Sequence, residues 1–186
     1  MQLVNANMMN ERFLSQASLS RAQNNVANCC QQLAQKGLTI AFAESATAGF
    51  LSFLFSLTNK SGDVLKGGII CYDACIKEDV LRVPSELMAQ FSAESLEVSD
   101  AIAAGLASII SADIHVGITG LTKPGGSESP EKPVGTIFTV IRAKDWQVAD
   151  RSIFTGTEQM IVEDTVSNLC MLIERKLAEI QSTYTG

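Results

Sequence analysis

Residues 38–49, L-T-I-A-F-A-E-S-A-T-A-G, decide the fold that the rest of the sequence supports. Residues 38–42 form a short, apolar run of residues that favour strands, which predicts a buried β-strand. Residues 50–55, F-L-S-F-L-F, are apolar and lack proline, which suits a helix packed on a sheet. Because the junction is small and polar, the sequence predicts a strand that turns abruptly into a helix.

The predicted turn between this strand and this helix is a candidate binding site. Backbone N–H groups at a helix start lack intrahelical partners, and together with the helix dipole they favour an anion, a phosphate or a developing oxyanion. Ser45 would present its hydroxyl to such a pocket. The alternative is structural, with Ser45 or Thr47 simply capping the helix through its side-chain oxygen.

The composition limits the class of protein. The chain has 186 residues, of which 46% are hydrophobic and 6% aromatic, so it fits one globular domain with an aliphatic core. Its net charge of −6 argues against a nucleic-acid-binding surface, which is normally basic. No apolar run is long enough to cross a bilayer and no signal peptide is visible, so we expect a cytoplasmic protein without a membrane partner.

The cysteines and the single histidine form no metal-binding pattern. Of the five cysteines, Cys71 and Cys75 are four residues apart, but His115 falls inside an apolar run, where a core position is the more common outcome. An odd number of thiols without zinc spacing indicates reduced, mostly structural cysteine. We therefore expect neither a metal nor a cofactor.

Helical and strand patterns alternate along the chain. Helices are predicted at residues 20–36, after Gly49, at 74–81, from Pro84, at 94–110 and at 157–180, and strands at 38–42, 68–71, 113–120, 134–141 and 146–154. Residues 1–18 lack a clear period and are expected to form a frayed or appended arm before a single domain at residues 19–182. The pattern predicts an α/β fold, a three-layer α/β/α domain with a mixed, mostly parallel sheet.

Polar residues follow three of the predicted strands, at residues 44–47, 72–73 and 119–120. If these strands are parallel neighbours, their loops converge on one cleft, because ligands of open α/β sheets bind beyond the carboxyl ends of the strands. The side chains expected to share this cleft are Ser45, Tyr72, Lys77 and Thr119. A serine and a desolvated, neutral lysine suffice for acyl transfer, although Lys77 also fits an exposed helical position.

Taken together, these motifs resemble the CinA C-terminal domain family, which includes the nicotinamide-nucleotide amidases, or NMN deamidases. The matching pieces are A-E-S-x-T-x-G at 43–49, G-G-x-x-x-Y at 67–72, Lys77, T-G at 119–120, and P-G-G at 124–126 followed by E-K-P-V-G-T at 131–136. The order and spacing of the family match from about residue 20 to about residue 178, so the resemblance covers nearly the whole chain. The resemblance implies hydrolysis of the nicotinamide amide of NMN to nicotinic acid mononucleotide and ammonia. We also expect a homo-oligomer that acts on a small molecule.

The resemblance assigns roles position by position. Ser45 matches the nucleophile, Lys77 the general base, and Tyr72 the tyrosine at the strand end. The backbone N–H groups of Ala46 and Thr47 would then hold the oxyanion.

The same comparison assigns the other substrate-binding positions. Thr119 and Gly120 match the cleft that follows the third strand. The backbone of Gly125 and Gly126 could approach a phosphate closely, as glycine allows. Lys132 either adds positive charge or holds its loop in place.

The sequence also departs from the family pattern. Ala46 and Ala48 replace a cysteine and a glycine of E-S-C-T-G-G, and Asp73-Ala74 replaces S-N after the tyrosine. The family usually has G-D-R-x-x-x-R after the last strand, with arginines suited to clamping a phosphate, whereas residues 156–162 are G-T-E-Q-M-I-V. Both arginines are therefore lost and Glu158 has the opposite sign.

Two interpretations follow. The retained Ser45, Lys77 and Tyr72 favour an active amidase with an altered substrate preference. The lost arginines favour a catalytically weak or inactive homologue that acts as a small-molecule or protein-binding module. Lys123 is a new cation that would compensate for the arginines from the other side of the cleft.

Overall fold

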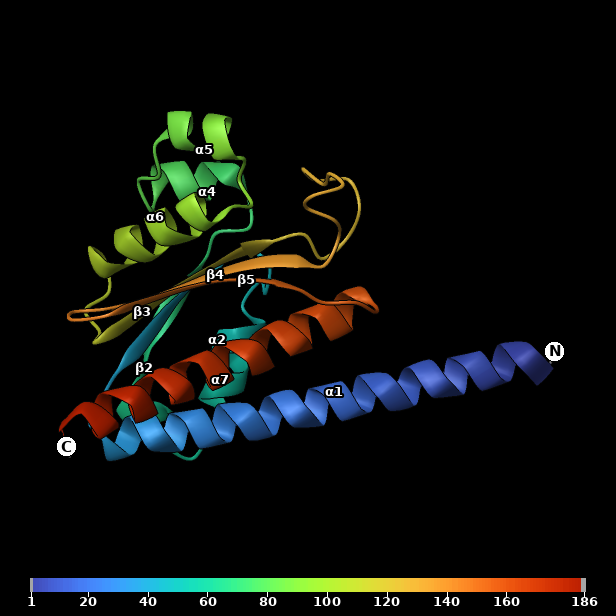
Figure 1. Cartoon of the computed structure of the whole chain (residues 1–186), viewed down its shortest axis with the longest axis horizontal. Helices are drawn as coiled ribbons and strands as arrows, with labels where there is room; N and C mark the ends of the chain where they lie inside the picture. Colours follow the sequence, from blue (N-terminus) through green and yellow to red (C-terminus); the bar gives the residue numbers. More distant parts are fainter. Residues whose placement is uncertain (1, 185–186) are drawn as a thin grey trace.

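Five strands form one sheet in the computed structural model, which describes the backbone of residues 2–184 and the side chains of residues 16–182 (Figure 1). The strands are β1 (Ile40–Glu44), β2 (Leu65–Ile70), β3 (Ile114–Gly120), β4 (Thr136–Ala143) and β5 (Gln147–Ile153), in the spatial order β2-β1-β3-β4-β5. β1 pairs in parallel with β2 and β3, whereas β4 pairs antiparallel with β3 and β5. β4 alone therefore runs against the other strands, which confirms the predicted mixed, mostly parallel sheet.

Helices cover both faces of the sheet, which gives the three predicted layers (Figure 1). One face carries α1 (Gln2–Gln35), α2 (Phe50–Ser56), α3 (Ser61–Val64) and α7 (Glu158–Tyr184), and the other carries α4 (Ala74–Asp79), α5 (Ser85–Phe91) and α6 (Leu96–Ala107). Each face has its own core. Side chains of β1 alternate between the two, with Ile40 and Phe42 in the first core and Ala41 and Ala43 in the second. This strand is buried on both faces, which explains its unbroken apolar run.

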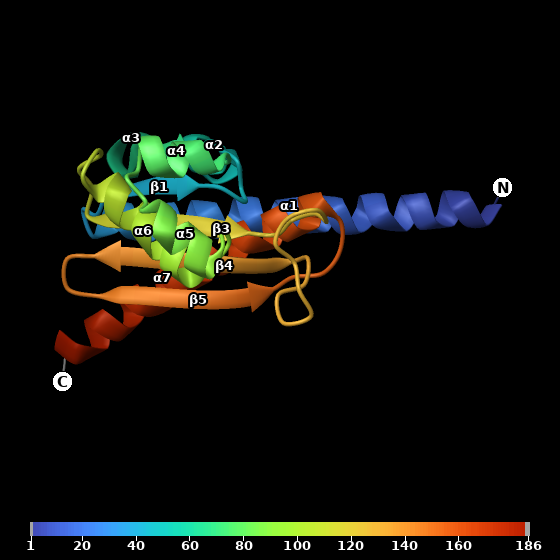
Figure 2. The ribbon, with the colours of Figure 1, turned by 90° about the horizontal axis from the view of Figure 1, so that it is seen from above.

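The first helix is longer than predicted. We expected a helix from Ser20, but α1 begins at Gln2 and runs to Gln35 without interruption. Its N-terminal half extends past the rest of the molecule in both views (Figures 1 and 2). The periodic apolar pattern is absent there because that half covers no sheet, yet no glycine or proline precedes Gly37 to end the helix. No helix within the described part of the chain, α1 included, is apolar enough over a sufficient length to cross a membrane.

The carboxyl ends of β1, β2 and β3 lie at the same edge of the sheet, as the parallel pairing requires. At this edge α6 approaches β3 so closely that a Cβ atom on Gly117 would lie 2.0 Å from the carbonyl oxygen of Ser99. A glycine is therefore needed at this crossing. The close packing fixes the direction of the side chains that follow on β3, and hence one wall of the predicted cleft.

Candidate active site

Ser45 lies in a tight turn between β1 and α2. Its N–H donates to the carbonyl of Ile118 at 3.0 Å, which continues the pairing with β3 for one more residue. The chain then reverses through Ala48 and Gly49, whose φ angles are 48° and 94°. Ser45 is 8% exposed, and its Oγ forms no hydrogen bond with the residues whose side chains the structure describes.

The start of α2 is capped by a side chain that the sequence analysis did not consider. The buried carboxylate of Glu44 accepts hydrogen bonds from the N–H groups of Gly49, Leu51 and Ser52 at 2.9, 3.1 and 2.8 Å. It also accepts one from the Thr47 hydroxyl at 2.7 Å. An internal carboxylate therefore meets the positive end of α2, and the N–H groups of Gly49, Leu51 and Ser52 are not available to a ligand. The alternative expectation, a cap by Ser45 or Thr47, was wrong, because the N-cap is Gly49 and the capping carboxylate is that of Glu44.

The donors that remain for a ligand lie in the turn itself. The N–H groups of Ala46 and Thr47 donate to no acceptor within the described residues. Both follow directly after Ser45 in the chain, and Ala46 lines a cavity beside it. Two such donors are what a developing oxyanion requires, and they were the donors expected from the sequence.

Two cavities adjoin at this turn. The first, here called the serine cavity, has a volume of about 180 Å³ and is lined by Ser45, Ala46, Tyr72, Glu94 and residues 120–126. The second, the acidic cavity, has a volume of about 310 Å³ and is lined by Ala46, Ala48, Phe50, Tyr72, Thr122, Lys123, Glu158, Gln159, Val162 and Glu163. Ala46, Tyr72, Thr122 and Lys123 line both. Tyr72, whose side chain is 57% exposed, therefore stands between the two cavities.

Lys77 is not among the residues that line the serine cavity, but it contacts the backbone of one of them, Tyr72. It belongs to α4, which begins after Asp73, and it is only 2% exposed, so the alternative of an exposed lysine was wrong. Its Nζ donates to the carbonyl of Tyr72 at 3.3 Å and forms no hydrogen bond with Ser45. Burial lowers the pKa of this amine, while negative groups nearby, among them Glu94, act in the opposite direction. The structure thus provides a desolvated lysine that is bonded to the backbone of Tyr72, a residue of the serine cavity, and not to the serine.

Thr119 faces away from the two cavities. Its side chain is fully buried, and its hydroxyl pairs with Ser99 Oγ at 2.9 Å and donates to the Ser95 carbonyl at 3.2 Å. It lies two residues after Gly117 on β3 and therefore points to the same face, toward α6. Gly120, by contrast, lines the serine cavity.

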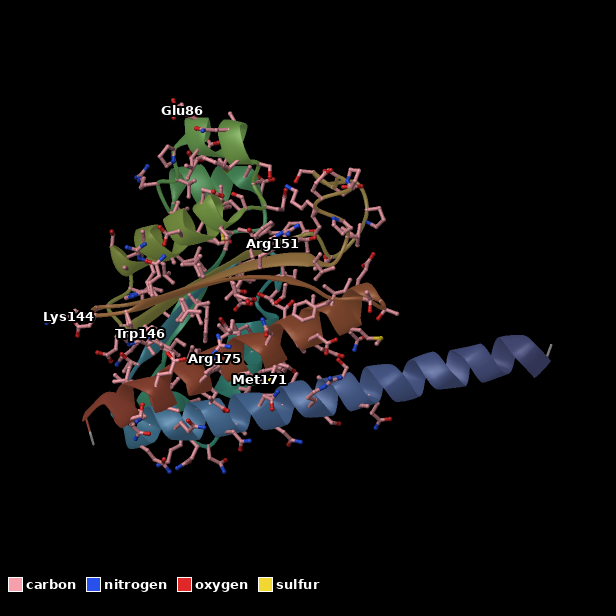
Figure 3. The ribbon with its side chains drawn as sticks, viewed as in Figure 1. Glu86, Lys144, Trp146, Arg151, Met171 and Arg175 are labelled. Atoms are coloured by element: carbon pink, nitrogen blue, oxygen red, sulfur yellow. The ribbon has the colours of Figure 1, made fainter. Side chains whose placement is uncertain are left out.

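Lys132 is engaged in holding the loop that follows β3. Its Nζ donates to Ser92 Oγ at 2.6 Å, to the Glu94 carbonyl at 3.1 Å and to Ser127 Oγ at 2.7 Å. From β5, Arg151 donates to the Glu131 carbonyl on the same loop (Figure 3). These contacts fit the second role considered for Lys132, that of positioning the loop.

The glycines of this loop already have a carboxylate partner. The N–H of Gly125 donates to Glu128 Oε1 at 2.7 Å. Hydrogen bonds from Gly125 and from the backbone of Glu128 and Gly126 lower the pKa of the Glu128 carboxyl. Both glycines line the serine cavity, but the N–H groups expected to meet a phosphate point at Glu128 instead. Lys123 is different, because it lines both cavities and has no hydrogen bond or ion pair with the described residues.

Two acidic residues were missed. Glu94 lines the serine cavity and accepts a hydrogen bond from Ser127 Oγ, although its sequence context indicated only a helix start. Glu163 lines the acidic cavity from within α7. No short-range signal identifies either, because an acidic residue at a helix start or within an amphipathic helix is normally solvated.

The fold and the site define the chain as a three-layer α/β protein with a candidate nucleophile in a strand-end turn. It belongs to the CinA C-terminal domain family, whose model matches residues 22–177. A "CinA-like protein" of Mycobacterium sp. (strain JLS) is 34% identical over 140 residues, which cover 75% of this chain and 33% of the relative. Another, of Synechococcus sp. (strain CC9311), is 38% identical over 108 residues, covering 58% and 25%. The chain thus spans a third or less of the length of these relatives.

Solved structures of the same superfamily share the fold. A competence-damaged protein (CinA) superfamily protein from Klebsiella pneumoniae 700603 superposes with a TM-score of 0.80 at 25% identity, over 85% of this chain and 98% of that one. A protein of the same superfamily from Enterobacter cloacae gives a TM-score of 0.73 at 27% identity, over 84% and 91%. These likenesses bear out the predicted family and fold class.

Proposed function

We propose that this protein is an amidohydrolase of the nicotinamide-nucleotide amidase type, which hydrolyses the amide of NMN to nicotinic acid mononucleotide and ammonia. The observation that supports this most is the Ser45 turn. It presents a hydroxyl without a hydrogen-bond partner in the described residues, beside two unused N–H donors, at the wall of a cavity. This is the arrangement that attack on an amide carbonyl needs.

In the proposed reaction, Ser45 Oγ forms a bond to the carbonyl carbon of the amide while its proton passes to a neutral Lys77. The carbonyl oxygen becomes an oxyanion that accepts hydrogen bonds from the N–H groups of Ala46 and Thr47. The C–N bond then breaks, and the proton on Lys77 goes to the leaving ammonia. Water hydrolyses the resulting ester, which releases the carboxylic acid and returns the proton to Ser45. No cofactor is required in this sequence.

The position of Lys77 sets one requirement on this mechanism. Its Nζ donates to the Tyr72 carbonyl, so the amine has to turn toward Ser45, or act through one water, when substrate is bound. Catalytic hydrogen bonds often tighten only in the complex with substrate. The lowered pKa of Lys77 supports its role, because only a neutral amine can accept the serine proton.

A second candidate function is binding without catalysis. The missing contact between Ser45 and Lys77 favours it, as does the carboxylate of Glu158 in the acidic cavity. On this interpretation the cavities hold a small molecule or a segment of a partner protein, and the chemistry has been lost.

An ammonia-release assay on NMN, nicotinamide and simple primary amides separates the two candidates. We expect release that depends on Ser45, so that Ser45→Ala reduces it to background. Release at the parental rate from the Ser45→Ala protein would end the proposed mechanism. Binding of these amides without any ammonia release would establish the second candidate instead.

A further inference from the structure

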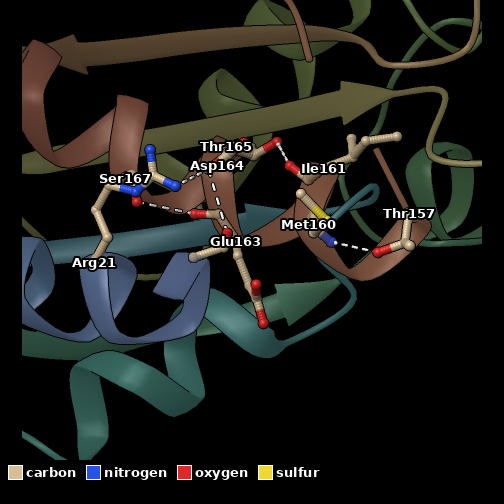
Figure 4. Close-up of polar contacts among 9 residues, drawn as sticks. Arg21, Thr157, Met160, Ile161, Glu163, Asp164, Thr165 and Ser167 are labelled. Atoms are coloured by element: carbon tan, nitrogen blue, oxygen red, sulfur yellow. Dashed lines mark hydrogen bonds and ion pairs between the residues drawn. The ribbon is translucent and has the colours of Figure 1, made fainter. Parts of the chain in front are cut away.

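A buried carboxylate in the acidic cavity lacks a partner for one of its oxygens. Glu163 is 0% exposed, and its Oε1 accepts a hydrogen bond from Gln159 Nε2 at 2.7 Å. Its Oε2 has no hydrogen-bond partner among the side chains and backbone that the structure describes. Figure 4 shows this carboxylate extending away from the other labelled polar groups, including Asp164, which pairs with Arg21. Glu163 thus lines the cavity and carries a buried acceptor that the described residues leave unused.

A buried carboxylate oxygen without a hydrogen-bond donor lowers the stability of the folded protein. An ionised carboxylate removed from water loses its hydration, and the loss is compensated only by a positive charge or by hydrogen-bond donors. The protein supplies one donor, from Gln159, and leaves the second oxygen open. Because Glu163 also lines a cavity, its unused oxygen points to a donor that a ligand supplies when the side chain turns toward it.

The charges around the cavity indicate the sign of that ligand. Glu158 also lines it, so two carboxylates face one cation, Lys123, which is exposed on the loop after β3. The described residues offer no group of three metal-ligating side chains, so the donor set suits an organic cation better than a divalent metal. A phosphate would meet these two carboxylates, one of which, Glu158, stands where the family usually carries an arginine.

We propose that the acidic cavity binds an ammonium group of the substrate, so that the preferred substrate is a small primary amide that carries a protonated amine. On binding, the Glu163 side chain turns toward the cavity so that Oε2 accepts a hydrogen bond from the ammonium, and the exposed Glu158 adds a second negative charge to the lining. An N–H cation fits better than a quaternary one, because the open oxygen requires a donor. The inference rests on the proposed function for the amide reaction alone and departs from it in the substrate. An amide that carries an N–H cation takes the place of NMN, whose pyridinium ring is positively charged but has no N–H to donate.

The geometry supports one molecule spanning both cavities. Tyr72, Ala46, Thr122 and Lys123 line both, so the cavities adjoin at the Ser45 turn. The carbonyl of an amide at Ser45 and an amine at Glu163 would thus belong to one short ligand. The acidic cavity, at about 310 Å³, matches the lower range of small-molecule sites.

Calorimetry on the Ser45→Ala protein at pH 7 tests this without turnover. The probes are a series from 3-aminopropanamide to 6-aminohexanamide, each paired with the n-alkanamide in which a methyl group replaces the ammonium. We expect the ammonium compound to bind at least tenfold more tightly than its neutral partner for one or more lengths, as a charge-assisted hydrogen bond would give. An equal affinity of the two compounds at every length would overturn the proposal.

Substitutions test which residue causes the preference for the ammonium compound over its neutral partner. Glu163→Gln keeps the acceptor for Gln159 and removes the charge, so it should abolish the preference. Glu174→Gln is the matched control, because Glu174 lies on the same helix and also has an unpartnered buried oxygen, but lines neither cavity. It should keep the full preference.

If Glu163→Gln fails to fold, the exposed Glu158→Gln should still lower the preference about threefold. A preference that survives in both Glu163→Gln and Glu158→Gln, or that Glu174→Gln removes, would refute the assignment.

The outcome is separable from that of the proposed function. An ammonium preference without ammonia release from any amide by the parent protein would sustain the cation site and reject the amidase. Ammonia release without any preference for the ammonium compounds would support the amidase and reject the cation site.

Discussion

The serine cavity and the acidic cavity meet at Tyr72 but leave opposite kinds of polar group unused. The serine cavity offers donors, since the N–H groups of Ala46 and Thr47 have no acceptor in the described residues. The acidic cavity offers an acceptor, since Glu163 Oε2 has no donor there. The first set suits the oxygen of a reacting carbonyl and the second a cation. The difference teaches that adjoining cavities of one scaffold can offer a ligand opposite polarities, so each can be tested by a different substitution.

The largest expected effect comes from removing the nucleophile. Ser45→Ala should lower ammonia release by roughly a thousandfold or more, because the other hydroxyl of the turn, that of Thr47, is buried and bonded to Glu44. Its melting temperature should stay close to that of the parent, since Ser45 Oγ has no hydrogen-bond partner to lose. Lys77→Ala should remove activity to a similar extent. Ser56→Ala at the end of α2 serves as the control and should retain activity.

The second effect concerns the stability of the turn. Glu44→Ala would leave the N–H groups of Gly49, Leu51 and Ser52 without their carboxylate. We expect a loss of about 3–5 kcal/mol in the free energy of unfolding, which thermal or urea denaturation would measure. Glu97→Ala is the control, because Glu97 is an exposed acid in the first turn of α6. It should cost less than about 1 kcal/mol. Equal losses in the two variants would contradict the capping role of Glu44.

Much of the fold follows from local pattern. The strand that became β1 and the helix α2 are marked by continuous apolar runs with a polar break between them, and tertiary packing reinforces both. The start of α1 could not be predicted from the apolar pattern. That pattern shows which face of a helix packs against other elements, and a helix segment that packs against nothing does not need it. The predicted division into an arm at residues 1–18 and a domain at 19–182 stays a prediction.

The site was less accessible to sequence reasoning. The position of Ser45 at a strand end follows from the predicted strand and helix on either side of it, whereas the strand order was assumed and not predicted. The capping role of Glu44 does not, because its carboxylate reaches the start of α2 only through the left-handed backbone of Ala48 and Gly49. The direction of Thr119 was available from the two-residue strand period counted from Gly117. The burial of Glu163 could not be predicted in this way, because it depends on elements far away in the sequence.

The third effect is the pH dependence of activity. Lys77 acts as a base only when neutral, and burial lowers its pKa from the ordinary lysine value. Below that lowered pKa the neutral fraction rises with pH, so activity should increase up to about tenfold per pH unit and level off above it. The measurement is kcat/KM for ammonia release from pH 6 to 9, with solvent viscosity varied to show that chemistry limits the rate. A flat profile under those conditions would argue against lysine as the base.

The smallest expected effect bears most directly on the comparison of the two cavities. Glu158→Arg places a cation where the family usually carries arginine, and it removes a carboxylate from the wall of the acidic cavity. Affinity for NMN should increase about three- to tenfold, because the position is exposed and water screens part of the attraction. The dephosphorylated riboside should bind almost as before. Calorimetry with both ligands would measure this.

Glu86→Arg controls for the change in net charge, since Glu86 is exposed on α5, away from both cavities (Figure 3). This variant should leave the affinity for NMN within about twofold of the parent, because charges beyond a Debye length are screened. If the parent already binds NMN in the low micromolar range and strongly prefers it to the riboside, the acidic cavity does not repel phosphate. Lys123, which lines both cavities and has no partner in the described residues, would then be the residue that holds the phosphate. In that case the protein would have kept both phosphate binding and the serine turn, and the acidic cavity would not select for a cation.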